Sequence, residues 1–423
     1  MKNNSYYLII GSSVAGVAAA ESIRKYDQKN SLTIITADTF PAFSRPLISY
    51  WLEGKVSDKD MFFQPEGFFS RKRIILRTGE KVQRINFARK LVFTSRDNYR
   101  YQKLLIASGT SPVIPEIPGK DLALTFTGFS EVQKIKKNLS QIKSVVIAGA
   151  GFIGLKAAEA IKKHNKEVTI VELQDRVLPT LLDDDGAAIY QRHLTKHGIK
   201  IILRTAIQKI ARHQNQYAVS LSNEKKISAD LVIMAVGVKP RIDFIPQNTL
   251  KINRAIVVNK YLQTSQKDVY AAGDCTMAPE LLSGQSGNIA IWPVAYRQGK
   301  IAGANMTGEK IIYEGSLAMN SVEVFGLPLI SVGKTLANPG EVQIIKSYRP
   351  EKMTYKKLLI QNNRLVGAIF INDIDRAGIY TGLIREKVDL TNFDLPQLLK
   401  ENFGFISVPS EVWKKKINPV EVE

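Results

Sequence analysis

The sequence predicts an α/β chain built on two similar strand–turn–helix units, followed by an α+β segment. The first unit reads SYYLIIGSSVAG over 5–16, and the second reads SVVIAGAGFIG over 144–154. Each consists of a short apolar run, a glycine-rich turn and a helix-like stretch. From about residue 315 onward, β-type runs alternate until a helix-like stretch opens at Asp375. These observations predict two Rossmann-like domains and a C-terminal α+β domain.

The two glycine-rich turns predict that each Rossmann-like domain binds a dinucleotide. Such a turn lets a pyrophosphate approach the backbone and lie on a helix N-terminus, where free N–H groups favour anions. Short β-type runs at 74–106 and 200–235 predict a β-meander inserted in each domain. Two dinucleotides held by one chain indicate that electrons pass from one to the other.

Composition and charge narrow the class of protein. The net charge is +20, and the densest basic stretch is Arg71–Lys103. Such a stretch favours acidic partners, although it also fits a solvated surface with no partner. No apolar run reaches the ~18–20 residues of a membrane span. The N-terminal YYLII superficially resembles a signal peptide, but Gly11 and Gly16 fall where a strand–turn–helix needs them.

The second fingerprint is complete. Gly149, Gly151 and Gly154 form G-x-G-x-x-G after an apolar strand, and Glu172 closes the next strand. A carboxylate there accepts hydrogen bonds from the adenosine ribose and repels a 2′-phosphate, so NAD is favoured over NADP. The alternative is that these glycines serve only tight packing between helix and strand.

The first fingerprint departs from the pattern at its middle position. Ser13 stands where the second glycine belongs, between Gly11 and Gly16, with Ala15 beside it. A serine is small enough for a pyrophosphate to approach, and its hydroxyl can donate a hydrogen bond. The following strand ends without an acid at its tip, and Asp38 is the candidate replacement for the ribose carboxylate.

A third motif, TSQKDVYAAGDC at 264–275, identifies the family that the chain resembles. It resembles the pyridine nucleotide-disulfide oxidoreductase superfamily of FAD- and NAD(P)-dependent flavoproteins. The resemblance covers essentially the whole chain. AFSRPLISYWL at 42–52 and FGLPLISVG at 325–333 place it nearest the branch of NADH–rubredoxin reductases and the flavin domains of nitrite reductases.

The resemblance implies roles for individual residues. Asp274 is expected to anchor the ribityl chain of FAD, and Arg45 to place a cation near the flavin ring, where it would stabilise the anionic reduced form. Lys156 stands where many relatives carry a glutamate beside the nicotinamide, so the charge at this position is reversed. The milder explanation for a lysine here is an ion pair with Glu159 on the same helix face. The remaining expected FAD contacts are Pro46, Val82, Ser108, Gly109 and Trp292, and Gly237 is expected at the NAD site.

The thiols and imidazoles that some relatives use are missing here. Disulfide reductases and NADH peroxidases of the superfamily carry cysteines in the stretch that corresponds to 42–52, which has none. Cys275, the single cysteine, follows the flavin aspartate and is interpreted as an inert core thiol. It also fits a reducing compartment, so we expect a cytoplasmic protein. His193 and His197 share helical spacing but lack a third ligand, and we expect no metal site.

The sequence therefore predicts an FAD-dependent NADH oxidoreductase that passes electrons to a small acidic carrier such as rubredoxin or ferredoxin. The alternatives are an NADH dehydrogenase or oxidase acting on a small molecule, and a flavoprotein subunit or NADH-responsive binding protein of a larger complex. We expect an FAD-binding domain at 1–112 and 244–314, an NAD-binding domain at 113–243, and an interface or dimerisation domain at 315–423. A homodimer fits this division, and no nucleic-acid partner is expected.

Overall fold

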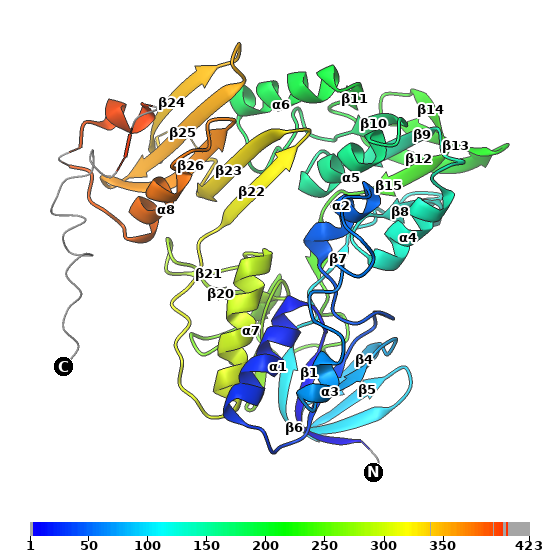
Figure 1. The fold of residues 1–423 in the computed structure, drawn as a ribbon, viewed down its shortest axis with the longest axis vertical. Coiled ribbons are helices and arrows are strands. Elements are labelled where there is room, and N and C mark those ends of the chain that lie inside the picture. Colours follow the sequence, from blue (N-terminus) through cyan, green and yellow to red (C-terminus); the bar gives the residue numbers. More distant parts are fainter. Residues whose placement is uncertain (1–2, 339, 392, 401–402, 405–423) are drawn as a thin grey trace. The chain divides into compact units, whose positions relative to one another are not determined.

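The chain folds into two compact units in a computed structural model that describes residues 3–338, 340–391, 393–400 and 403–404 (Figure 1). The first unit comprises the described residues up to Pro115, Thr125–Gln141 and Val236–Ser316. The second comprises Glu116–Leu124, Ile142–Ala235 and the described residues from Leu317 onward.

The first unit is built on a sheet of order β3-β2-β1-β6-β5-β4, in which β19 also pairs with β6. Strands β3, β2, β1, β6 and β19 are parallel, whereas β4 and β5 continue from β6 as an antiparallel meander. The bounds are β1 (Asn4–Ile10), β2 (Leu32–Ile35), β3 (Ile75–Arg77), β4 (Val82–Asn86), β5 (Leu91–Thr94), β6 (Asn98–Ile106) and β19 (Val269–Ala271). The central strands are apolar and buried, as expected for a parallel sheet covered on both faces.

Two long helices of the first unit pack closely against each other. These are α1 (Val14–Tyr26) and α7 (Trp292–Met306). A Cβ atom at Gly299 would lie 2.2 Å from the carbonyl oxygen of Ala15, and one at Gly303 would lie 2.3 Å from that of Ala19. Only glycine permits this approach, so the two glycines set the distance between the helices.

Shorter elements complete the first unit. The helical ones are η1 (Arg45–Leu47), α2 (Ile48–Leu52), α3 (Phe68–Arg71) and α4 (Phe129–Asn138). Two small sheets have the orders β16-β7 and β17-β18-β20-β21. Their strands are β7 (Thr110–Pro112), β16 (Val238–Pro240), β17 (Ile252–Asn253), β18 (Ala255–Val257), β20 (Thr276–Pro279) and β21 (Ser286–Gly287).

The second unit repeats the α/β pattern. Parallel strands lie in the order β11-β10-β9-β15, and β12, β13 and β14 form a separate antiparallel meander. The bounds are β9 (Ser144–Ala148), α5 (Phe152–Lys162), β10 (Glu167–Val171), α6 (Asp184–Lys196), β11 (Ile199–Ile202), β12 (Ile207–His213), β13 (Gln216–Leu221), β14 (Lys226–Ala229) and β15 (Leu231–Met234). At the start of this part of the chain lie η2 (Lys120–Leu122) and β8 (Leu124–Thr125).

The C-terminal part of the second unit is an antiparallel sheet of order β22-β23-β26-β25-β24. Its elements are β22 (Met319–Val324), β23 (Leu327–Gly333), β24 (Gln343–Arg349), β25 (Thr354–Gln361), β26 (Arg364–Ile371), α8 (Ala377–Arg385) and η3 (Leu395–Leu399). The expected class, two Rossmann-like domains with β-meanders and a C-terminal α+β domain, is confirmed. No helix in the described ranges is long and apolar enough to cross a membrane.

The structure refines two expectations about the meanders. Strand β3 pairs in parallel with β2 at the edge of the first sheet, so it belongs to the α/β core and not to the meander. Strands β11 and β15 likewise join the parallel sheet of the second unit. Short apolar strands look alike in a sequence whether they pair in parallel or antiparallel, and only the pairing separates them.

Candidate functional site

The first glycine-rich turn has the close backbone contacts of a dinucleotide turn. Gly11 has φ +107°, and a Cβ atom there would lie 2.2 Å from the carbonyl oxygen of Ala107. A Cβ atom at Gly16 would lie 1.9 Å from the carbonyl oxygen of Gly11. Ser13 is the N-cap of α1, but its hydroxyl makes no capping bond, and Ala15 is buried in the first turn. The first N–H groups of an α-helix have no partner within the helix, which favours an anionic ligand here.

Asp274 lies beside this helix N-terminus with its carboxylate unused. It follows Gly273, whose N–H donates to Gln298 Oε1 at 2.7 Å and whose Cβ position would be 3.1 Å from the Cβ of Ala15. Burial raises the pKa of Asp274, and the positive charge of Arg45 opposes that rise. Among the described residues nothing donates a hydrogen bond to the carboxylate of Asp274. A half-buried acceptor without a protein donor fits a ligand that brings hydroxyl groups.

Arg45 is held in place by three contacts. Its guanidinium lies 3.4 Å from Asp38, donates to the carbonyl oxygen of Thr127 at 2.8 Å, and covers the ring of Phe43. Burial lowers the pKa of Arg45, but an arginine remains protonated at neutral pH. Asp38 is therefore the ion-pair partner of Arg45, and the ribose role predicted for it has no geometric support of its own. Pro46 is exposed in η1.

The other residues predicted to contact FAD also lie in the first unit. Val82 is buried in β4. Ser108 donates through Oγ to the carbonyl oxygen of Arg241 at 2.6 Å, and Gly109 has φ +65° with open space at its Cβ position. Trp292 begins α7, and its ring meets that of Phe63 edge to face at 5.3 Å. The first turn of α7 carries no acidic residue, so its positive dipole end is not neutralised there.

An aromatic cluster next to Arg45 was not predicted from the sequence. Phe129 of α4 packs against Phe40, Phe43, Trp51 and Phe62. This packing fixes the segment that presents the carbonyl oxygen of Thr127 to Arg45. The density of aromatic residues between 40 and 63 was the available signal, but nothing in the sequence indicated that α4 would join them.

The second glycine-rich turn differs from the first in having open space at its middle position. Gly149 has φ +99°, and a Cβ atom at Gly154 would lie 2.0 Å from the carbonyl oxygen of Gly149. Gly151 is the N-cap of α5, and no atom lies within 4 Å of its Cβ position. Two of the glycines are therefore required by the turn itself. The third leaves room for a pyrophosphate.

Glu172 anchors this turn as well as standing at the end of β10. Its two carboxylate oxygens accept from the N–H groups of Ala150 at 2.6 Å and Gln174 at 2.9 Å. Each oxygen keeps acceptor capacity, because a carboxylate offers about four acceptor positions. The sequence did not indicate that Glu172 would also hold the glycine-rich turn through these two hydrogen bonds.

Lys156 forms the ion pair with Glu159 that the sequence offered as the milder explanation. Its ammonium group also donates to the carbonyl oxygen of Glu323 at 3.1 Å, and Glu159 accepts from the N–H of Phe325 at 2.6 Å. Lys156 thus ties α5 to β22, and Glu159 ties it to the turn that follows β22. The nicotinamide-side role of Lys156 stays a prediction. Gly237 belongs to the first unit, where its carbonyl oxygen accepts from the N–H of Val113.

The histidines and the cysteine have structural surroundings. His193 Nε2 lies 3.2 and 3.1 Å from the carbonyl oxygens of Val324 and Phe325, and the ring of His197 stacks on Phe325. Cys275 is fully buried, with its thiol near the carbonyl oxygens of Ile106 and Ala272. Within the described ranges, no three metal-ligating side chains gather at one place.

Comparisons with known proteins give the family. The sequence profile of the pyridine nucleotide-disulphide oxidoreductases matches residues 5–299, more than half of the chain. The chain belongs to this family. It is an oxidoreductase, and FAD and NADH are the cofactors that its family uses. Residues 319–388 match a second profile, described as the C-terminal domain of rubredoxin NAD+ reductase.

Individual relatives agree with this membership. The chain is 28% identical over 390 residues to the epsilon subunit of NADH-dependent phenylglyoxylate dehydrogenase of Aromatoleum evansii, covering 91% of this chain and 92% of that protein. It is 35% identical to an NADH oxidase of Methanocaldococcus jannaschii, covering 71% and 70%. NADH:rubredoxin oxidoreductase from Clostridium acetobutylicum has a TM-score of 0.78 and 25% identity, covering 93% and 98%.

Proposed function

We propose that this flavoprotein passes electrons from NADH to a small electron-carrier protein such as rubredoxin or ferredoxin. The observation that carries the proposal is the burial of Cys275, the single cysteine of the sequence. Burial raises the pKa of its thiol, and such a thiol is a poor nucleophile. With no thiol relay in the sequence, the flavin itself is the outlet, and that suits a carrier that accepts electrons one at a time.

The residues of the chain would divide the work between the two units. When bound, FAD would accept a hydride from NADH and release the electrons singly or in pairs. In the first unit, the N-terminus of α1 would bind the FAD pyrophosphate and Asp274 would accept a ribityl hydroxyl. Arg45 would supply a fixed positive charge. In the second unit, the turn at Gly151 would bind the NADH pyrophosphate and Glu172 its ribose.

A carrier as partner is supported by the C-terminal match and by charge. Residues 319–388 match the C-terminal domain of rubredoxin NAD+ reductase, and a rubredoxin oxidoreductase shares the fold. Arg71, Lys72 and Arg73 are exposed where α3 ends. The guanidinium of Arg24 donates to the carbonyl oxygens of Lys72 and Arg73, so the backbone that presents these cations is fixed. Rubredoxins and ferredoxins are typically acidic, and opposite charges speed encounter.

The names of two relatives point to other electron acceptors. One 35% identical protein is named an NADH oxidase, and a 28% identical one is named a subunit of an NADH-dependent dehydrogenase. An oxidase would consume oxygen at the rate at which NADH is oxidised, with no carrier present. A subunit would copurify with a second chain and would reduce that chain faster than any free carrier.

Anaerobic stopped-flow spectroscopy tests the proposal. We expect NADH to bleach the flavin band rapidly, and the reduced protein then to be reoxidised by rubredoxin or ferredoxin faster than by oxygen. Reoxidation by oxygen that keeps pace with NADH oxidation would instead support the oxidase. Bleaching too slow to sustain turnover would contradict a reductase of any kind.

A further inference from the structure

The loop that leads from Glu172 to α6 lies against the second glycine-rich turn. Leu178 donates its N–H to the carbonyl oxygen of Ala150 at 3.0 Å, and Gln174 donates its N–H to Glu172. Arg176 closes the loop on itself, because its Nε donates to the carbonyl oxygen of Leu182 at 3.0 Å. The shape of this loop, residues 173–182, therefore affects the groups that surround Glu172.

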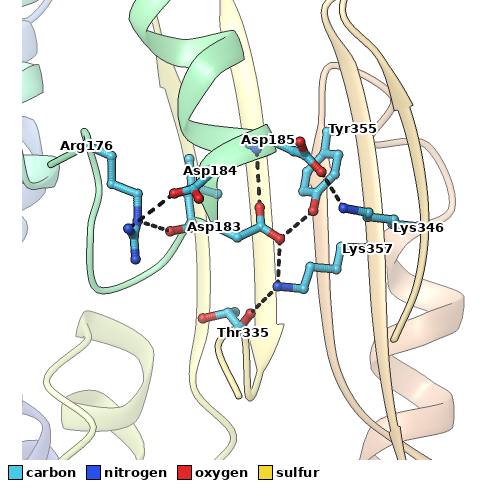
Figure 2. Close-up of polar contacts among 10 residues, drawn as sticks. Arg176, Asp183, Asp184, Asp185, Thr335, Lys346, Tyr355 and Lys357 are labelled. Carbon is cyan, nitrogen blue, oxygen red and sulfur yellow. Dashed lines mark hydrogen bonds and ion pairs between the residues drawn. The ribbon is translucent and has the colours of Figure 1, made fainter. Parts of the chain in front are cut away.

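The loop ends at Asp183, and Figure 2 shows what holds that residue. One carboxylate oxygen of Asp183 accepts from the N–H of Gly186 at 3.2 Å and so caps α6. The other accepts from the hydroxyl of Tyr355 at 2.7 Å and lies 2.8 Å from the ammonium of Lys357. Lys357 also donates to the carbonyl oxygen of Thr335. Tyr355 and Lys357 belong to β25, so the end of the loop is fastened to the C-terminal sheet.

The two β25 residues of this contact are buried, whereas the side chain of Asp183 is 27% exposed. Lys357 is 3% exposed and Tyr355 is fully buried. A Cβ atom at Gly186 would lie 3.3 Å from the ring of Tyr355, so the first turn of α6 sits directly on β25. Hydrogen bonds from Lys357 and Tyr355 outweigh desolvation and lower the pKa of Asp183. The carboxylate is therefore ionised at neutral pH.

An ion pair with a buried ammonium group is a poor way to gain stability. Removing the charge of Lys357 from water costs several kcal/mol, and well-packed apolar residues often serve stability as well or better. The pair does restrict geometry, since both partners must meet in one arrangement. Lys357 and Tyr355 converge on a single oxygen of Asp183, which fixes the point where the loop ends.

We infer that Asp183 and Lys357 are positioning residues for the coenzyme. The C-terminal sheet, through this pair, holds loop 173–182 in the conformation in which Glu172 meets the adenosine ribose. The inference rests on the proposed binding of NADH at Glu172. It assigns to the C-terminal sheet a part in coenzyme affinity, in addition to any part in binding a carrier.

The same helix and the same sheet supply a matched control. Asp185, two residues further along α6, pairs with Lys346 of the neighbouring strand β24 at 2.5 Å. The side chain of Lys346 is 51% exposed, and the pair does not touch the end of the loop. Lys346→Met thus removes one cation from the same sheet without releasing Asp183.

The experiment measures binding of ADP-ribose, which contains the adenosine ribose and pyrophosphate of NADH but no nicotinamide. Lys357→Met and Asp183→Asn should each weaken its affinity by about tenfold, a size typical of coupling between sites. The KM for NADH should rise in step, while the rate of flavin reduction at saturating NADH stays unchanged. Lys346→Met should bind ADP-ribose as the unmodified protein does. Lys357→Arg, which keeps the charge, should recover most of the affinity.

The outcomes separate this inference from the function on which it rests. If the unmodified protein binds ADP-ribose and is reduced by NADH, but Lys357→Met and Asp183→Asn bind equally well, the positioning role is wrong. If the unmodified protein neither binds ADP-ribose nor is reduced by NADH, the proposed function itself fails. Should Lys357→Met not fold, Asp183→Asn decides, because asparagine keeps the cap on α6 and the volume of the side chain.

Discussion

Asp274 and Glu172 are acidic residues at the ends of strands, but their carboxylates are in different situations. Glu172 accepts hydrogen bonds from two backbone N–H groups and thereby shapes the turn beside it. The carboxylate of Asp274 has no hydrogen-bond donor among the described residues, and burial raises its pKa. Replacing Asp274 should therefore affect a ligand much more than the fold, whereas replacing Glu172 affects both.

Asp274→Asn should weaken retention of FAD. A hydrogen bond to a charged acceptor contributes about 1.5–3 kcal/mol, so the dissociation constant for FAD should rise by roughly ten- to a hundredfold. Flavin content after gel filtration, and titration of the apoprotein with FAD, measure this. Asp268→Asn is the control, because Asp268 pairs with Lys90 at 2.8 Å just before the same strand. Equal flavin loss in both variants would contradict the role of Asp274.

Glu172→Gln should narrow the preference for NADH over NADPH. Glutamine keeps one acceptor for the backbone N–H groups but no longer repels a 2′-phosphate. We expect the ratio of kcat/KM values for the two coenzymes to fall by about tenfold, since tenfold corresponds to about 1.4 kcal/mol, close to the lower end of the range for one charged hydrogen bond. Glu167→Gln, at the exposed start of β10, should leave the ratio unchanged. If the unmodified protein reacts better with NADPH than with NADH, the role assigned to Glu172 is wrong.

Helices α1 and α7 bring together the two parts of the candidate FAD site, the first glycine-rich turn and Asp274. Gly299 and Gly303 let α7 approach α1, and Gln298 of α7 binds the N–H of Gly273 next to Asp274. The distance between the helices therefore sets where Asp274 lies relative to the first glycine-rich turn. A side chain placed between the two helices would therefore displace Asp274 relative to the turn.

Gly303→Ala should destabilise the protein and reduce its FAD content. The added Cβ would lie 2.3 Å from the carbonyl oxygen of Ala19, a contact that forces the helices apart. Overpacking of this kind typically costs about 1–3 kcal/mol. Gly378→Ala in α8 meets no atom within 4 Å and should be neutral or slightly stabilising. Thermal unfolding of both variants, with flavin content, checks this; equal melting temperatures would contradict the packing argument.

The turn between β22 and β23 binds to α6 through His193, and this contact should depend on pH. Burial lowers the pKa of His193 below the ordinary value of about 6.5. The unfolded chain therefore takes up the proton first as pH falls, so the stability that the neutral imidazole contributes is lost progressively as the pH falls below about 6.5. His193→Gln, which keeps a donor for the carbonyl oxygens, should show a smaller fall in melting temperature over this range.

The exposed His213 of β12 provides the comparison for this pH effect. His213→Gln should show the same fall in melting temperature with decreasing pH as the unmodified protein. If both variants follow the same pH profile as the unmodified protein, His193 does not carry the effect.

Elements with a local signature were predictable from the sequence, and those that depend on distant partners were not. Helix-like stretches were predicted after the two glycine-rich turns, and α1 and α5 are found there, because an apolar run followed by such a turn marks the start of each helix. Gly11, Gly16, Gly149 and Gly154 were recognised by their spacing, whereas Gly299 and Gly303 of α7 were not. The placement of α4 on the aromatic cluster and the pairing of Asp183 with Lys357 had no local signal. Each depends on a partner more than 65 residues away in the sequence.

At the scale of the whole molecule, positive charge is the property most relevant to a partner. The net charge is +20, and residues 1–140 carry 22 basic against 12 acidic side chains. Association steered by such charge is fast at low salt and slows as the screening length shortens to about 10 Å at 0.1 M salt. The proposed NADH site consists of other residues, the turn at Gly151 and Glu172, so reduction of the flavin by NADH should depend much less on salt. The two half-reactions should therefore respond differently to salt.

The second-order rate constant for reduction of rubredoxin or ferredoxin, measured against salt, tests the central claim most directly. It should fall steeply from low to moderate salt while reduction of the flavin by NADH changes little. Replacing Arg71, Lys72 and Arg73 by alanine should lower it at low salt. Replacing Lys209, Lys225 and Lys226, which are also exposed and lie in the second unit, should lower it less. A carrier rate independent of salt, and equal in both triple variants, would contradict electron delivery to an acidic carrier.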